Sequence, residues 1–215
     1  MKKKTALVFG GNGLIGTFLV QELIRDNRYA EVVLFLRKSI RSRHLKLREE
    51  IVDFKDFNNI SKVAAGDEVY CCVGTTIRKA GSQERFRKVD FDLPVKIAEL
   101  CAANHIDKIA VVSSLGANPE SNNFYLRTKG EMEKAVLASG VKKAYFFRPS
   151  MLLGKRSESR PAEFISKYLM QALSFLFVGP LKKYKAIHAK KVARAMVQVM
   201  NNERESSFVE SYEMH

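Results

Sequence analysis

The segment that most constrains the fold lies near the N-terminus, where a glycine-rich turn joins two regular segments. Residues 6–9 (Ala-Leu-Val-Phe) lead into Gly-Gly-Asn-Gly-Leu-Ile-Gly, and apolar residues then recur at helical spacing. A strand, a tight glycine turn and a helix N-terminus in this order form a site for pyrophosphate, because the helix presents free N–H groups and a positive dipole end. The spacing G-x-x-G-x-x-G therefore predicts a dinucleotide site that comprises Gly10, Asn12, Gly13, Leu14, Ile15 and Gly16.

The composition is that of a folded globular domain. The chain has 215 residues, 46% of them hydrophobic, which suffices for one large domain with a substantial core. No run approaches the ~20 apolar residues of a membrane-spanning helix. Residues 1–5 are basic but lack a cleavage site, which favours a cytoplasmic location.

The cysteines and histidines do not form a ligand pattern. The adjacent pair Cys71-Cys72 lies in an apolar run and Cys101 stands apart, so we interpret them as buried, inert thiols rather than a disulfide framework. The four histidines are scattered, and we predict no metal site.

The net charge of +14 and the isoelectric point near 9.7 favour anionic partners. The cations are spread along the chain, with local groups in residues 37–48 and 182–194. A solvated basic surface, a phosphate-bearing ligand and a peripheral contact with an anionic membrane are alternatives. Aromatic residues do not alternate with the cations as they do where bases stack, which argues against nucleic acid.

Strand-like and helix-like segments alternate along most of the chain. Strands are expected at residues 5–9, 31–36, 68–73, 108–113 and 143–148, with a further short strand ending at residues 51–53, and helices at 14–26, 93–101, 125–138 and 192–200. Near-continuous apolar strands between helices predict an α/β fold, a doubly wound parallel sheet of the Rossmann type with helices on both faces.

The sequence predicts a single NAD(P)-binding Rossmann domain over residues 1–215, with a small substrate-side or lid region at about 150–190. Residues 164–181 are rich in large apolar side chains and precede a basic run. They are interpreted as a helix packed on the main domain, with an interfacial membrane contact as the alternative.

The tip of the second strand indicates which nicotinamide cofactor binds. An acid at this position bonds the ribose 2′-hydroxyl of NAD, whereas a guanidinium accommodates the 2′-phosphate of NADP. Here the strand ends in Arg37 and Lys38, and no acid stands at its tip. We therefore expect NADP(H) rather than NAD(H), with Arg37 as the chief determinant and Lys38 as its helper. A surface arginine without a ligand is the alternative.

A possible acid–base group follows the strand at residues 108–113. Tyr125 and Lys129 are four residues apart, so a helix would place them on one face. An ordinary phenol releases its proton near pH 10, and a nearby ammonium stabilises the phenolate. Tyr125 could then exchange a proton with a carbonyl oxygen that Ser114 or Ser113 orients.

Together these residues resemble the short-chain dehydrogenase/reductase superfamily, most closely its small atypical, Tat-interacting-protein-like members. The resemblance covers residues 5–197 and includes Cys-Cys-Val-Gly-Thr-Thr at 71–76, Val89-Asp90, Ser-Ser-Leu-Gly-Ala at 113–117, Phe-Arg-Pro at 147–149 and Glu-Ser-Arg-Pro at 158–161.

The resemblance implies roles for individual residues. Asp53 would contact the adenine, Gly74 and Thr75 the adenosine-side backbone, and Lys129 the nicotinamide ribose. Phe54 and Arg148 are further predicted cofactor contacts. Of the two serines, Ser114 matches the catalytic serine better.

The leading hypothesis is an NADP(H)-dependent oxidoreductase that acts on a small carbonyl or alcohol, with Ser114, Tyr125 and Lys129 as its catalytic residues. About 65 residues follow Pro149, too few for the substrate domain of nucleotide-sugar enzymes. The alternatives are an NADPH-binding regulatory or interaction protein with little turnover and a membrane-peripheral enzyme for a lipophilic substrate. Substrate identity and oligomeric state leave no mark in the sequence.

Overall fold

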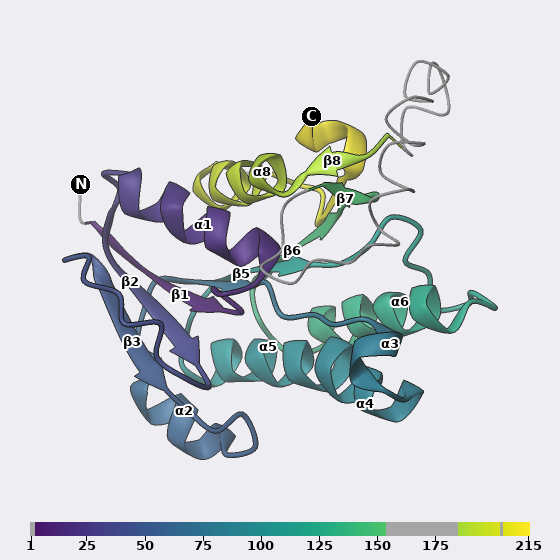
Figure 1. The fold of residues 1–215 in the computed structure, drawn as a ribbon, viewed down its shortest axis with the longest axis horizontal. Helices are drawn as coiled ribbons and strands as arrows, with labels where there is room; N and C mark the ends of the chain where they lie inside the picture. The colour runs from purple at the N-terminus through teal and green to yellow at the C-terminus, as the bar shows by residue number, and fades with distance from the viewer. Residues whose placement is uncertain (1–2, 154–184, 203) are drawn as a thin grey trace.

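The computed structural model describes residues 3–153, 185–202 and 204–215. Within them, a parallel sheet has the strand order β3-β2-β1-β4-β5-β6-β9 (Figure 1). Its strands are β1 (Lys4–Phe9), β2 (Tyr29–Leu36), β3 (Leu47–Ile51), β4 (Glu68–Cys71), β5 (Lys108–Val112), β6 (Lys143–Arg148) and β9 (Phe208–Glu210). The predicted lid region and the segments 158–161, 164–181 and 182–183 lie largely or wholly outside the described residues.

Most of the strands are rich in apolar residues because both faces of the sheet are covered, and the edge strand β3 (Leu-Arg-Glu-Glu-Ile) is the exception. In β1, Ala6 and Val8 point into one core, whereas Leu7 and Phe9 point into the other. Successive side chains of a strand alternate between the faces, so a strand in the middle of such a sheet has no polar face. This packing confirms the predicted doubly wound parallel sheet.

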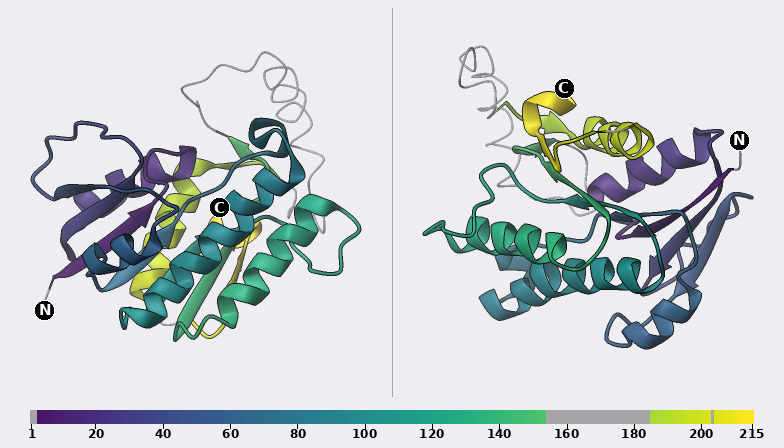
Figure 2. Two further views of the ribbon diagram at one scale, coloured as in Figure 1. Left: turned by 90° about the horizontal axis from the view of Figure 1, so that it is seen from below. Right: turned by 180° about the vertical axis from the view of Figure 1, so that it is seen from behind.

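Helices form a layer on each face of the sheet, as the two views of Figure 2 also show. On one face α1 (Leu14–Arg25) lies beside α8 (Ala189–Asn201), and their apolar stripes share one core. On the other face lie α2 (Phe57–Val63), α5 (Leu93–Ala103) and α6 (Phe124–Leu137). The expected helices at 14–26, 93–101 and 125–138 thus correspond to α1, α5 and α6, and the C-terminal one to α8.

Shorter elements complete the chain and refine the predicted bounds. They are α3 (Ile77–Ala80), α4 (Gln83–Arg87), the π-helical turn η1 (Lys88–Asp92), the pair β7 (Leu152–Leu153) and β8 (Ile187–His188), and the 3₁₀ helix η4 (Ser211–Met214). β4 ends at Cys71 rather than at residue 73, and β9 was not predicted. The side chain of Asn123 accepts a hydrogen bond from the N–H of Leu126, so α6 begins one residue earlier than expected.

From β1 to β3 the strands are added on one side of β1, and from β4 onward they are added on its other side. β1 pairs in parallel with β2 on one side and with β4 on the other, so the loops that follow β1 and β4 diverge to opposite faces. In an open parallel sheet, this switch point leaves a crevice at the carboxyl ends of the strands. The glycine-rich turn after β1 therefore lies where such folds bind ligands.

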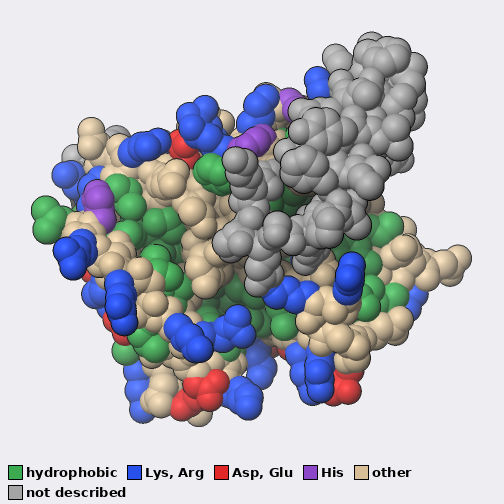
Figure 3. Space-filling view, viewed as in Figure 1, with side chains coloured by type: hydrophobic (Ala, Val, Ile, Leu, Met, Phe, Trp, Pro, Cys, Tyr) green, Lys and Arg blue, Asp and Glu red, His purple; other side chains and the backbone are tan. Residues whose placement is uncertain are grey.

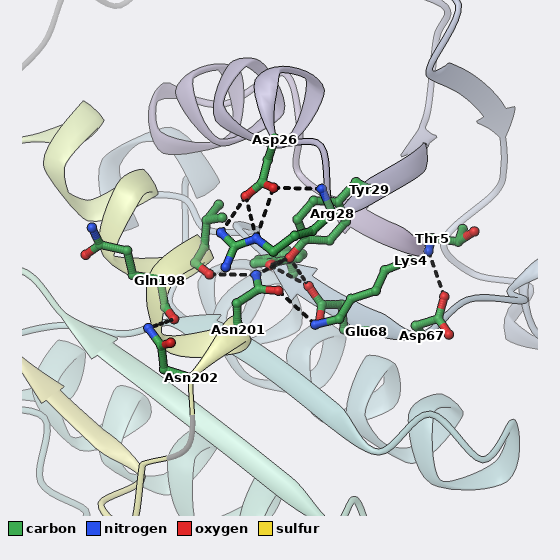
Figure 4. A network of polar contacts seen from close by, with 12 residues as sticks. Lys4, Thr5, Asp26, Arg28, Tyr29, Asp67, Glu68, Gln198, Asn201 and Asn202 are labelled. Carbon is green, nitrogen blue, oxygen red and sulfur yellow. Dashed lines mark hydrogen bonds and ion pairs between the residues drawn. The ribbon is translucent and has the colours of Figure 1, made fainter. Parts of the chain in front are cut away.

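At the opposite end of the sheet, a buried carboxylate joins three elements (Figure 4). Glu68, 1% exposed, accepts hydrogen bonds from the hydroxyls of Tyr29 and Tyr70 and pairs with Lys4 at 3.0 Å. Asn201 at the end of α8 donates to the Tyr29 hydroxyl at 2.6 Å. Burial and the neighbouring Glu68 charge raise the pKa of both tyrosines, so they remain neutral donors.

Replacing Glu68 by alanine is expected to lower the free energy of unfolding by about 3 kcal/mol, because two buried hydroxyls lose their shared carboxylate acceptor and Lys4 loses its ion-pair partner. The control is Glu31→Ala, which breaks only an exposed pair with Arg48 and should cost under about 1 kcal/mol. Urea unfolding of both variants measures the difference. Equal losses would mean that the buried network contributes no more than a surface ion pair.

No helix among the described residues is long and apolar enough to cross a membrane.

Candidate dinucleotide-binding and catalytic site

A cavity of about 620 Å³ opens at the carboxyl ends of β1, β4 and β5. Its lining comes from the glycine turn and the start of α1, from the loop after β4, and from the start of α6. Nine predicted site residues line it: Asn12, Gly13, Leu14, Ile15, Gly74, Thr75, Ser113, Tyr125 and Lys129. The volume lies in the range of small-molecule and cofactor sites.

Gly10 and Gly16 are not in the cavity lining, but they shape the turn that contributes Asn12 and Gly13 to it. Gly10 has a φ of +79°, and a Cβ there would lie 2.7 Å from the carbonyl carbon of Cys72. A Cβ on Gly16 would lie 2.1 Å from the carbonyl oxygen of Gly10. The turn can therefore bring α1 against the sheet only with glycine at both positions. Its geometry is further fixed by the N–H of Gly13, which donates to the Gly10 carbonyl at 3.0 Å.

The N-terminus of α1 fits the diphosphate of a dinucleotide. Gly13 is the N-cap residue and makes no side-chain cap, so the first-turn N–H groups of α1 are not bonded by a capping side chain. These groups have no partner within a helix, and they carry the positive end of its dipole. Leu14 and Ile15 at this end line the cavity, and the first turn contains no acid that would repel phosphate.

The two consecutive serines after β5 occupy different environments. The hydroxyl of Ser113 is buried, lines the cavity and has no hydrogen-bond partner among the described residues. Ser114 is not in the cavity lining, and its hydroxyl donates to the Leu115 carbonyl at 3.4 Å. A strand ending here directs neighbouring side chains to opposite sides. The structure therefore favours Ser113 over Ser114 as the serine that faces a ligand.

Tyr125 and Lys129 both line the cavity from the first turns of α6. The ring of Tyr125 packs against the buried ring of Phe86, with 5.6 Å between centroids. Lys129 is 3% exposed, and its ammonium forms an ion pair of 2.8 Å with Asp90 of η1. Tyr125 and Lys129 thus lie on one face of α6, as predicted, and both side chains reach the same cavity.

The charge state of Lys129 reflects two opposing effects. Burial is the largest single effect and lowers the pKa of this ammonium, but the charge and hydrogen bond of Asp90 together with the nearby Tyr125 and Cys71 outweigh it, and the pKa lies above the ordinary 10.5. Because the folded-state pKa is raised, the stabilisation that depends on the Lys129 proton is present in the neutral range and is lost as the pH rises from 10.5 through the raised value. Lys129 is therefore a cation throughout the neutral range.

Four further residues predicted to bind the cofactor follow the carboxyl ends of β2 and β3. They lie outside the cavity lining. Arg37 and Lys38 are exposed and follow β2 directly, beside the glycine turn, because Phe35 of β2 pairs with Phe9 of β1. Asp53 is exposed after β3, and the ring of Phe54 packs edge-on against Phe9 with 6.3 Å between centroids. Contact of these four residues with a cofactor stays a prediction.

Arg148 joins three elements of the fold through its guanidinium. Its guanidinium makes two hydrogen bonds to the buried Glu133, at 2.9 and 2.6 Å, and a third to Glu210 at 3.0 Å. It also lies over the Phe208 ring, 4.2 Å from the centroid. These contacts join β6, α6 and β9 and occupy the planar fork. Arg148 is not in the cavity lining, and its contact with a cofactor stays a prediction.

Several lining residues were not predicted. The sequence indicates Asp90 only as part of the family segment Val89-Asp90, but an acid among the buried positions Phe86, Pro94 and Ile97 is a signal that could identify it. Cys72 contributes to the cavity lining but is partly buried, and burial raises its thiol pKa well above the ordinary value, as it raises that of the buried Cys71 to about 11. The other unpredicted lining residues are Thr17, Phe18, Val73, Thr76, Lys79, Val112 and Leu152.

The strand order, the glycine turn and the cavity at the switch point define a dinucleotide-binding protein of the Rossmann class. The model of the NAD dependent epimerase/dehydratase family matches residues 6–213, and the chain belongs to this family. Rat Protein HTATIP2 is 33% identical over 177 residues, which cover 80% of this chain and 73% of that protein. The mitochondrial protein FMP52 of Candida glabrata is 33% identical over 161 residues, covering 74% and 68%.

Solved structures show the same fold at lower identity. MoeE5 in complex with UDP-glucuronic acid and NAD superposes with a TM-score of 0.72 at 21% identity, covering 95% of this chain and 74% of that one. A UDP-N-acetylglucosamine 4-epimerase from Methanobrevibacter ruminantium gives 0.68 at 20% identity, covering 95% and 75%. These likenesses confirm the predicted Rossmann architecture. A cytoplasmic location remains a prediction.

Proposed function

We propose that the protein is an NADP(H)-dependent oxidoreductase of the short-chain dehydrogenase type that interconverts a small carbonyl compound and its alcohol. The observation that carries this proposal is the composition of one cavity. Gly13 and Gly74 line it together with Ser113, Tyr125 and Lys129. A diphosphate site and an acid–base group in one cavity are what a nicotinamide-dependent reaction requires.

In the proposed reaction, the bound nicotinamide supplies or accepts the hydride at the substrate carbon. The chain's own residues handle the oxygen and its proton. In the reducing direction, the Ser113 hydroxyl donates a hydrogen bond to the carbonyl oxygen, and the Tyr125 hydroxyl gives it a proton. The buried Lys129 ammonium then stabilises the phenolate that Tyr125 becomes. In the oxidising direction the same proton returns from the alcohol to Tyr125.

The preference for NADP(H) is supported by the charge at the tip of β2. Arg37 and Lys38 are both exposed there, and no acid follows the strand within the next ten residues. A guanidinium can hold a 2′-phosphate through two parallel hydrogen bonds. Over the rest of the face drawn in Figure 3, Lys and Arg side chains are spread widely rather than gathered in one stripe.

We expect Arg37→Ala to weaken NADPH binding about tenfold, or 1.4 kcal/mol, and to leave NADH binding unchanged, because only NADPH carries the 2′-phosphate. Arg43→Ala is the control, since it removes the same charge from an exposed position in the same loop. Calorimetric titration of the three proteins with both nucleotides measures the effect. An unchanged NADPH affinity in Arg37→Ala would make Arg37 a surface residue without a ligand.

The substrate proposed is a small carbonyl or alcohol with an apolar body. Phe18, Val112 and Leu152 contribute apolar side chains to the same cavity as Tyr125. Apolar walls with a few converging polar groups bind such a ligand and orient its one polar atom. NADPH oxidation with a panel of aldehydes and ketones, together with NADP⁺ reduction with the matching alcohols, tests this proposal.

A second candidate function is an NADPH-binding regulatory or interaction protein with little turnover. The ion pair of Lys129 with Asp90 supports it, because a carboxylate 2.8 Å away offsets the charge that would stabilise a Tyr125 phenolate. Tight NADPH binding without turnover across the panel would favour this candidate. A peripheral membrane contact is a further proposal, tested by sedimentation with anionic liposomes at low and high salt.

A further inference from the structure

The buried carboxylate of Asp90 contacts two parts of the site at once. One oxygen, Oδ1, lies 2.8 Å from the Lys129 ammonium of α6. The other, Oδ2, accepts the backbone N–H of Thr75 at 2.8 Å in the loop after β4. Asp90 and Lys129 are 1% and 3% exposed, so water does not compete for these contacts.

The backbone around Asp90 is arranged to bring this acid inward. α4, the π-helical turn η1 and α5 follow one another without a break, and Asp90 is the third residue of η1. A π-helical turn adds a residue to a helix and shifts the side chains that follow it, and such turns are frequent at functional sites. The adjacent Phe86 packs against the Tyr125 ring, so this segment borders the site at two points.

We propose that Asp90 is a positioning residue that joins the cofactor-binding loop at Thr75 to Lys129 in one buried bridge. It fixes the Lys129 ammonium at the cavity and keeps it charged, and it sets the Thr75 backbone against the same cavity. Its contribution to catalysis rests on the proposed function, whereas the bridge itself does not. A ligand bound at residues 74–75 would therefore lie next to a Lys129 ammonium whose position is already fixed.

The charged and titratable groups that face Lys129 are few among the described residues. Asp90 comes from η1, Tyr125 from α6 and Cys71 from β4. Cys71 is a neutral thiol at ordinary pH. Removing the Asp90 charge would therefore leave the ammonium buried without a full counter-charge, and burial alone favours its neutral form.

The first test measures the bridge without any nucleotide. Asp90→Asn and Lys129→Met should each lower Tm by about 10 °C, because each leaves one buried charge unpaired, and the double variant should recover most of the loss. Asp92→Asn, which removes the same charge two residues further on, should leave Tm nearly unchanged. If the Tm losses of the two single variants simply add in the double variant, the proposed bridge between Asp90 and Lys129 is overturned.

The second test asks whether the bridge reaches the loop. Lys129→Met should speed hydrogen exchange of the Thr75 amide at least tenfold in NMR, because Asp90 is then free to turn. The Ala117 amide, which donates to the Ser114 carbonyl at 3.1 Å, serves as the internal reference. Exchange of Thr75 that stays at the wild-type rate in the folded variant would overturn the coupling.

The third test uses the pH dependence of NADPH affinity. In Asp90→Asn, affinity should fall about tenfold between pH 6 and pH 9 as Lys129 loses its proton, while the wild-type protein keeps its affinity over this range. Parallel profiles for the two proteins would overturn the role in charging Lys129. Failure of the wild-type protein to bind NADPH would instead contradict the proposed function and leave the first two tests to decide on the bridge.

Discussion

Gly16→Ala is expected to weaken dinucleotide binding more than a hundredfold, or about 2.7 kcal/mol. The added Cβ would lie 2.1 Å from the Gly10 carbonyl oxygen and 2.8 Å from the Gly11 Cα. Both are backbone atoms, so no side chain can rotate away. The turn must then separate from α1, and the N–H groups at the start of α1 no longer converge with the loop after β4 on one diphosphate.

Calorimetric titration with NADPH measures this loss, and circular dichroism checks that the variant is folded. Gln21→Ala is the matched control, because Gln21 is exposed on the same helix α1. A graded series strengthens the comparison. Gly13→Ala, whose Cβ would lie 3.2 Å from the same Gly10 oxygen, should fold more readily than Gly16→Ala. Wild-type affinity in a folded Gly16→Ala protein would remove the glycine turn from the cofactor site.

Tyr125→Phe is expected to lower turnover at least a hundredfold while changing NADPH affinity less than threefold. The phenol proton accounts for the first effect, since general acid catalysis contributes about 10² to 10⁴ in rate. The second follows because phenylalanine keeps the ring that packs against Phe86. The two effects together separate the loss of a proton donor from general damage to the cavity.

The measurement is steady-state turnover on a carbonyl compound found in the substrate panel. Tyr212→Phe is the control, because Tyr212 is 58% exposed and its ring lies outside the cavity lining. Full turnover in Tyr125→Phe would show that another group supplies the proton. Equal losses of turnover and of NADPH affinity would indicate a collapsed cavity rather than a missing acid.

The central part of the fold could be predicted from sequence because its signals are local. Each strand from β1 to β6 except β3 is a short apolar run, and α1 follows a glycine turn whose role depends on neighbouring residues alone. β9 has three residues and lies at the sheet edge, so it carries too little periodicity to be recognised. It forms because Phe208 and Val209 pair with β6.

The site was predictable only in part, because contacts distant in sequence decide the roles of individual residues. Arg148 matches the family motif, but Glu133 and Glu210 determine where its guanidinium lies. The choice between Ser113 and Ser114 depends on the side to which the strand end turns each side chain. Asp90 acquires its importance from Lys129, a residue on another helix. These contacts between residues distant in sequence cannot be predicted from residue type and spacing.

The most direct test is calorimetric titration of the purified protein with NADPH and, separately, with NADH. The glycine turn and Arg37 together predict binding of both nucleotides, with NADPH preferred tenfold or more, a difference of about 1.4 kcal/mol. That result would support the cofactor site and justify the search for a carbonyl substrate. Binding of neither nucleotide would contradict the proposed oxidoreductase and would favour an interaction protein built on a Rossmann fold.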